Sequence, residues 1–163
     1  MSWSERRVAL GALWALALGG CGFELRQTQP MPFQTIALAG FGARSELAAE
    51  LRRSLEGRAR VVETPAQAQV VLTALADERG ESVVASTSAA QVREFQLRLK
   101  FGFRVSTPGG RELTGPVELA LTRDLTYSEN LALAKEEEQA DLYREMRADI
   151  VSQVTRRLAA LRL

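Results

Sequence analysis

The sequence predicts an α+β fold, a two-layer sandwich in which two helices pack on one face of a mixed four-stranded sheet. Three observations favour it. Apolar and polar side chains alternate over residues 95–105, which is the period of a strand with one buried face. Apolar residues recur every four positions from Leu142 to Leu158, which is typical of an amphipathic helix. The predicted elements follow the order strand, helix, strands, helix, as expected for one sheet covered by helices.

The first 20 residues are predicted to be a signal peptide that is removed and takes no part in the fold. Arg6 and Arg7 precede an apolar run over residues 8–18. A helix of that length rises about 16 Å, well short of a hydrocarbon core about 30 Å thick. A basic segment followed by a short apolar one is typical of a secretory signal.

Cys21 is the only cysteine among 163 residues, and it stands at the end of this apolar segment. The stretch Leu18-Gly19-Gly20-Cys21 resembles the bacterial lipobox, in which the thiol receives S-diacylglycerol and the new amine is N-palmitoylated after cleavage. Two or more acyl chains suffice for stable anchoring. Because Gly22, and not Asp, follows the cysteine, we expect delivery to the outer membrane. The alternative is a spare cysteine beside an ordinary signal peptide.

The mature chain is expected to form a lipidated tether followed by one domain. Residues 21–32 contain two prolines and several polar side chains, which favours a tether. Residues 33–163 are then a single domain that begins with a strand over 33–39, ended by Gly40.

A first helix is predicted between Ser45, a suitable N-cap, and Gly57, a suitable residue for the C-terminal cap. Three leucines spaced four apart form its apolar face: Leu47, Leu51 and Leu55. Three arginines lie off that face: Arg52, Arg53 and Arg58. A solvated face is the favoured interpretation of these arginines, and a ligand-binding role is the alternative.

The strands that follow are predicted with unequal clarity. Residues 61–62 suit a short strand and 69–75 a fuller one, whereas 80–90 has little periodicity and is predicted to be a hairpin or loop. The alternating strand over 95–105 ends at the turn 107–110. Its return strand runs over 117–127, with Pro116 at a bulge or near the strand start. Arg123 interrupts the apolar face of this strand. It is expected at the sheet rim, and pairing is the alternative.

The last helix is predicted to complement its own dipole. Glu136, Glu137 and Glu138 are placed near its N-terminal end, whereas Arg156 and Arg157 are near its C-terminal end. Dipole complementation is favoured over a metal site for the three glutamates. The sheet face away from the helices is expected to carry Arg98, Lys100 and Arg104, and to stay wet or meet a partner.

Composition argues against catalysis. The chain has no histidine, its only thiol is assigned to acylation, and it has neither a Gly-rich phosphate loop nor a G-x-S-x-G elbow. We therefore predict a protein that is not an enzyme, with no metal and no cofactor. The net charge of +1 argues against a broad nucleic-acid surface.

Four segments resemble the LptE family of lipopolysaccharide (LPS)-assembly lipoproteins: 21–26, 93–95, 121–127 and 131–139. Their order and spacing carry the resemblance, which extends over nearly all of residues 21–161. It implies an outer-membrane lipoprotein that plugs and helps assemble the LptD β-barrel and binds LPS on its way to the outer leaflet. It also implies two helices packed on a small sheet, in agreement with the pattern of the residues.

The same resemblance implies three LPS-binding candidates. Lys135 matches the lysine of the family's Ala-Lys-acidic segment, and we expect it just before the last helix, near outward-facing backbone donors. Arg93 is the nearest substitute for a family arginine in the loop before the long strand. Arg123 lies in the strand that resembles the family. The alternative function is a lipid-anchored scaffold subunit of another envelope machine, such as one that inserts β-barrels, with no lipid ligand.

Overall fold

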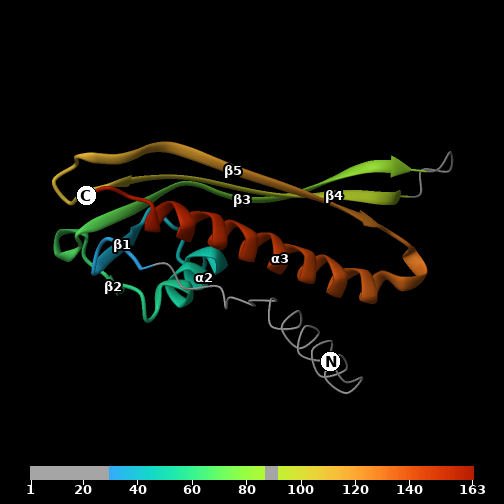
Figure 1. The fold of residues 1–163 in the computed structure, drawn as a ribbon. Coiled ribbons are helices and arrows are strands. Elements are labelled where there is room, and N and C mark those ends of the chain that lie inside the picture. Colours follow the sequence, from blue (N-terminus) through green and yellow to red (C-terminus); the bar gives the residue numbers. More distant parts are fainter. Residues whose placement is uncertain (1–29, 87–91) are drawn as a thin grey trace, which may run out of the picture.

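The computed structural model describes residues 30–86 and 92–163, so the signal peptide, Cys21 and most of the tether lie outside the described residues. Two α-helices and a mixed sheet in the order β2-β1-β3-β4-β5 form the described part. The sheet thus has five strands, one more than predicted, because the short stretch around Val61 joins it as β2. Both helices lie on one side of the long strands (Figure 1). The strands are β1 (Thr35–Ala39), β2 (Arg60–Val62), β3 (Val70–Ser86), β4 (Val92–Ser106) and β5 (Glu112–Thr126).

The parallel part of the sheet is built around β1. Ile36 of β1 lies opposite Val61 of β2 and Val70 of β3, and both neighbours run parallel to β1. The helix α2 (Glu46–Leu55) connects β1 to β2, and it begins where Ser45 predicts. The Ser45 hydroxyl accepts a hydrogen bond from the Ala48 N–H at 3.0 Å and donates one to Asp77 of β3 at 2.6 Å. One side chain therefore caps α2 and ties it to the sheet.

β3 is much longer than predicted, and it includes residues 80–86, which we expected to form a hairpin or loop. β1 pairs only with the first part of β3, up to Thr73. Beyond that point β3 is held by its antiparallel pairing with β4, which continues as far as Ser86. This half of the strand is mostly exposed and polar, so it lacks the apolar pattern that marks a strand in a sequence.

The antiparallel pair of β4 and β5 agrees with the predicted return strand. The Gly110 N–H donates to the Thr107 carbonyl at 3.0 Å, which closes the predicted turn. The register of β5 shifts between Thr114 and Val117, so Pro116 sits in a bulge, as its missing N–H predicts.

The helix α3 (Ala132–Ala159) runs along the sheet and completes the core. One face of β4 packs against it, and the core side chains of α3 are Tyr143, Met146, Ile150, Val151, Val154 and Leu158.

The polar half of β3 is tied to the same helix. The Tyr143 hydroxyl donates to the Gly80 carbonyl at 2.7 Å, and the guanidinium of Arg79 lies 3.9 Å from the centre of the Tyr143 ring.

α2 and α3 are joined by a nearly buried ion pair. The Arg147 Nε donates to Glu50 at 2.9 Å, and a second guanidinium nitrogen lies 2.8 Å from Glu46. The side chains of Arg147 and Glu50 are only 14% and 16% exposed. Ser54 and Thr155 share a hydrogen bond of 3.2 Å further along the two helices. The relative position of the helices is therefore fixed by directional contacts.

The sheet face away from the helices carries the charges that alternation predicts. Arg98 and Arg104 are exposed there, and Lys100 lies 3.0 Å from Glu118. The hydrogen bond and the charge of Glu118 raise the pKa of Lys100. A small apolar cluster around Ala37 and Val71 covers the same face at its parallel end.

Gly40 offers a test of how closely β1 and β3 approach. Its φ of +77° favours glycine, and a Cβ at this position would collide with the carbonyl oxygen of Ala74. We expect Gly40→Ala to lower the free energy of unfolding by more than about 2 kcal/mol, measured by urea denaturation. Gly57→Ala is the matched control. Its φ is +75° but no atom lies within 4 Å of the added Cβ, so it should cost about 1 kcal/mol. Equal losses in the two variants would contradict the proposed collision.

Candidate functional site

The ends of β3 and β5, the start of β4 and the start of α3 meet at one end of the molecule, which we name the distal end. The Tyr127 N–H, just after β5, donates to the Arg93 carbonyl of β4 at 2.8 Å. The rings of Tyr127 and Phe95 pack edge to face with centroids 5.2 Å apart. A single turn of 3₁₀ helix (Glu129–Leu131) then leads into α3. Local pairing thus fixes where α3 begins relative to the sheet.

Lys135 lies inside α3, and not before it as expected. The helix begins at Ala132, so Lys135 stands beyond the N–H groups that a helix start leaves without partners. Its Nζ lies 2.7 Å from Glu138, and its side chain is only 18% exposed. The positive charge of Lys135 is therefore offset by a carboxylate one turn away.

The three glutamates do not complement the helix dipole as predicted. The first turn of α3 contains no acidic residue, because the helix begins earlier than the apolar stripe indicates. Glu136 and Glu137 are exposed, and Glu138 pairs with Lys135. The dipole effect falls off within the first turn, so these carboxylates gain little from it. At the opposite end, Arg156 and Arg157 occupy the last turn, as predicted.

Arg93 belongs to the distal end with Lys135. It is exposed at the start of β4, and its carbonyl accepts the Tyr127 hydrogen bond described above. These two predicted basic residues are 42 positions apart in the sequence, but β4 and α3 begin at the same end of the molecule (Figure 1).

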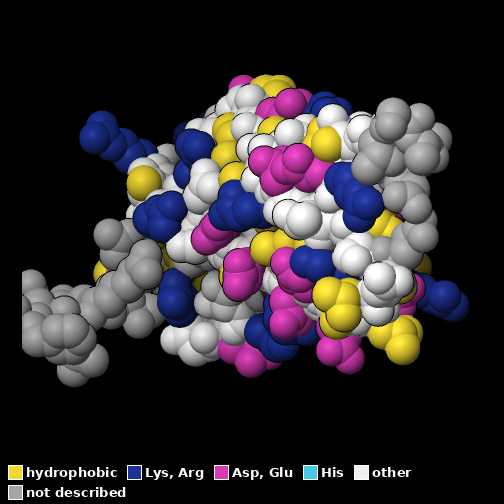
Figure 2. Space-filling model, turned by 90° about the vertical axis from the view of Figure 1, so that its right-hand side faces the viewer, with side chains coloured by type: hydrophobic (Ala, Val, Ile, Leu, Met, Phe, Trp, Pro, Cys, Tyr) yellow, Lys and Arg dark blue, Asp and Glu magenta, His cyan; other side chains and the backbone are white. Residues whose placement is uncertain are grey.

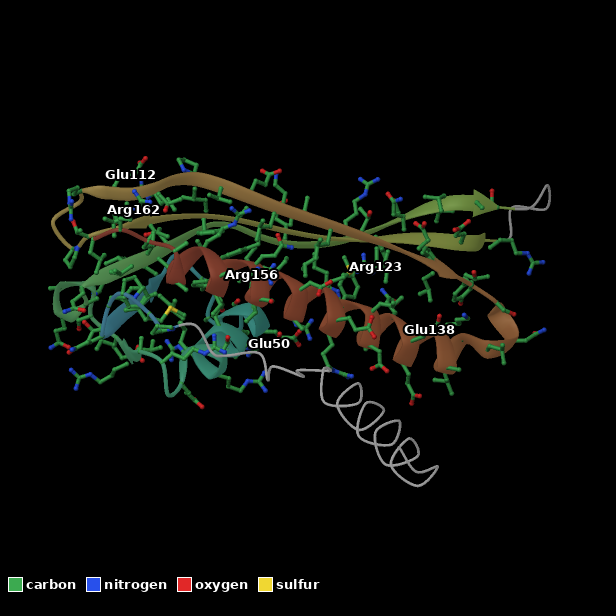
Figure 3. The ribbon with its side chains drawn as sticks, in the orientation of Figure 1. Glu50, Glu112, Arg123, Glu138, Arg156 and Arg162 are labelled. Atoms are coloured by element: carbon green, nitrogen blue, oxygen red, sulfur yellow. The ribbon has the colours of Figure 1, made fainter. Side chains whose placement is uncertain are left out.

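Arg123 is not part of this group. It points toward α3 from β5, opposite Leu97 of β4, and its guanidinium lies 3.4 Å from Asp149. The pairing alternative is therefore correct, and the expected position at the rim also holds, because β5 is an edge strand of the sheet. Asp149 is 14 residues beyond Lys135 on α3, which corresponds to about 21 Å along the helix. Figure 3 labels Arg123 and, nearer the start of α3, Glu138.

The distal end also exposes apolar side chains that do not belong to any predicted site. Leu133 is 80% exposed and Leu131 is 56% exposed, immediately before Lys135. Val83 and Val84, near the end of β3, are about half exposed. Figure 2 shows this end of the molecule, where hydrophobic, basic and acidic side chains are mixed. The only sequence signal was two leucines outside the apolar stripe of the helix.

The described residues contain no group of three or more potential metal ligands. No described helix is long and apolar enough to cross a membrane. The distal end combines cations, carboxylates and exposed leucines, which is the chemistry of a contact surface.

Solved structures that share this fold include three lipoproteins. Lipoprotein B from Nitrosomonas europaea, determined by solution NMR, is 29% identical with a TM-score of 0.72, and the match covers 85% of this chain and 91% of that one. Rare lipoprotein B from Shewanella oneidensis is 24% identical with a TM-score of 0.65, covering 78% and 95%. A minor lipoprotein from Acinetobacter baumannii is 20% identical with a TM-score of 0.65, covering 81% and 96%. No match was found among curated proteins.

The family model for LptE, described as lipopolysaccharide-assembly, matches residues 33–158. This range contains both helices and all five strands of the described sheet, apart from the last residue of α3. The match and the shared fold show that the chain belongs to the LptE family of lipopolysaccharide-assembly proteins.

Proposed function

We propose that this protein is a non-enzymatic outer-membrane lipoprotein that plugs and helps assemble the LptD β-barrel and binds LPS during its transport to the outer leaflet. The family match over residues 33–158 is the observation that carries this proposal. The fold agrees with it, since the described part is a small sandwich with exposed polar faces on both layers.

Anchoring is assigned to Cys21. It lies outside the described residues, and its role is supported by the lipobox-like sequence Leu18-Gly19-Gly20-Cys21 and by the lipoprotein names of the three similar structures. Acyl chains on this residue would hold the domain at a bilayer through a tether of about a dozen residues.

LPS binding is assigned to the distal end. An LPS molecule presents phosphates beside acyl chains, and here the cations Lys135 and Arg93 share one end of the molecule with the exposed Leu131 and Leu133. A lysine offers a compact charge that pairs with phosphate, while the leucines offer surface to hydrocarbon. Arg123 is proposed only as a weaker candidate, since it is already paired with Asp149.

One observation favours the alternative of a scaffold without a lipid ligand. Because Glu138 already satisfies Lys135, an incoming phosphate must displace a carboxylate at 2.7 Å. An LPS-binding plug and a scaffold without a lipid ligand can be told apart in two ways. Breaking the Lys135–Glu138 pair should affect LPS binding only in the plug, and the two functions imply different proteins that co-purify with this one.

Co-purification tests the plug. Detergent extraction of native membranes should recover the protein with a large β-barrel partner in about a one-to-one ratio, identified by mass spectrometry. Recovery of the protein alone, or with a different envelope machine, would contradict the proposal.

Cys21→Ala tests the anchor. Without the thiol, acylation cannot occur, and we expect an unprocessed precursor on immunoblots of fractionated cells. A processed, membrane-bound form of the variant would refute acylation at this residue.

Lys135→Asp tests the distal end. Loss of a charged contact should weaken LPS binding about tenfold, measured at low ionic strength so that screening does not mask the effect. Lys100→Asp makes the same charge change on the opposite sheet face and should leave the affinity unchanged. Glu138→Gln should tighten binding, because it frees Lys135. Unchanged affinity in both the Lys135 and Glu138 variants would favour the scaffold.

A further inference from the structure

A groove opens to solvent between α2 and α3, well away from the distal end. Its volume is about 650 Å³, within the range of small-molecule sites. Arg53 and Arg58 line it from α2 and the residues just after it, while Arg144 and Arg156 line it from α3. Figure 3 labels Arg156 on α3 and Glu50 on α2, on the two helices that form the groove.

The charge of this groove is largely uncompensated. Within residues 30–86 and 92–163, Arg53, Arg58 and Arg156 form no ion pair, whereas Arg144 lies 2.8 Å from Asp141. Arg156 instead donates a hydrogen bond to the Ser152 hydroxyl at 2.7 Å. Glu50 also lines the groove, but Arg147 neutralises it from the helix interface. The guanidinium groups are therefore available to an anion.

The lining between these arginines is small and hydroxyl-rich. Ser54 and Thr155 meet there across the two helices, with Ser152 and Ala148 beside them. The described lining contains no aromatic side chain and no leucine. Hot spots of protein interfaces are enriched in tryptophan and tyrosine as well as arginine. Because this lining has arginines but no aromatic side chain, it suits a hydrated anion better than a peptide or an acyl chain.

We propose that the groove between α2 and α3 binds a phosphorylated headgroup, a phosphate ester carried on a sugar or glycerol. Arginine pairs with phosphate through two parallel N–H···O bonds, and here such groups come from both sides of one groove. Thr155 is buried and already donates to the Val151 carbonyl, so Ser54 and Ser152 are the hydroxyls that can bond the attached polyol. Arg156 is 21 residues beyond Lys135 on α3, or about 31 Å along the helix, so this is a second anion site that does not depend on the distal end.

The test uses the mature protein in neutral detergent micelles at low ionic strength. One titration adds glucose 1-phosphate, with glucose as the uncharged control, and another adds phosphatidylglycerol to the micelles, with phosphatidylcholine as the control. The readouts are the dissociation constant and the NMR shifts of the arginine Nε–H groups. We expect saturable binding of at least one phosphorylated probe, with shifts at Arg53, Arg58 and Arg156. Binding of glucose 1-phosphate shows that a free ester suffices, and binding of phosphatidylglycerol alone shows that the headgroup must be presented by lipid.

Matched double variants separate a site from general charge. Arg53→Gln with Arg58→Gln should raise the dissociation constant at least about tenfold. Arg52→Gln with Arg157→Gln removes the same charge from the same region, but neither residue lines this groove, so it should raise the constant clearly less than the first double variant, because only long-range attraction is lost. Circular dichroism and thermal unfolding check that all variants are folded, as expected for exposed positions.

Two results would overturn the proposal: neither phosphorylated probe binds, whether or not a glutamate-rich peptide does, or the two double variants lose affinity equally. Binding in the groove can be tested separately from LPS binding at the distal end. Lys135→Asp should leave the binding of these probes unchanged, whether or not it affects LPS.

Discussion

The burial of one face of β4 under α3 is the constraint on which the rest of the structure depends. Leu97, Leu99, Phe101, Phe103 and Val105 alternate along the strand, and each is at most 4% exposed. Burial of such side chains contributes about 1.5–3 kcal/mol each before entropy is subtracted. The Phe101 and Phe103 rings also stack with centroids 5.3 Å apart. Because this row extends along much of the strand, it lays α3 lengthwise on the sheet and thereby determines where the distal end and the helix groove lie.

Polar contacts then fix the position of the helices within that layer. Apolar packing alone tolerates sliding, whereas Arg147 must reach both Glu46 and Glu50 at once. Desolvated charges are costly when a partner is missing, so a shift of α2 along α3 would leave Glu50 buried without compensation. The arginines on the two sides of the groove are held at their spacing by this ion pair and by the Ser54–Thr155 hydrogen bond.

The sequence predicted the elements in which the spacing of apolar residues reflects which face is buried. β4 and the body of α3 were found because alternation and four-residue spacing reflect a single covered face. The outer half of β3 was missed, because residues such as Arg79 and Glu81 are held by cross-strand pairing and by contacts to α3, not by burial. The three residues of β2 count as a strand only because β1 lies beside them.

The candidate sites were also predictable only in part, because contacts between segments far apart in the sequence leave no local pattern. The family resemblance picked out Lys135, but the helix start and the Glu138 pair depend on how the chain leaves β5. Arg53 and Arg58 were recognised as lying off the leucine face. Their neighbour Arg156 is about a hundred positions away in the sequence, and only the packing of two helices brings them to one groove.

Since β3 extends past β1, the outer part of β3 and the whole of β5 are lateral margins of the sheet in the described part of the chain. Edge strands of this kind expose unpaired backbone N–H and C=O groups, which can pair with a strand of another molecule and so promote aggregation. Both carry features that oppose it: register shifts at Val83–Ala85 and around Pro116, and charges such as Glu78 and Asp124. The outer half of β3 is irregular and polar, which is why the pattern of residues did not predict it. The same features discourage copies of the protein from pairing edge to edge.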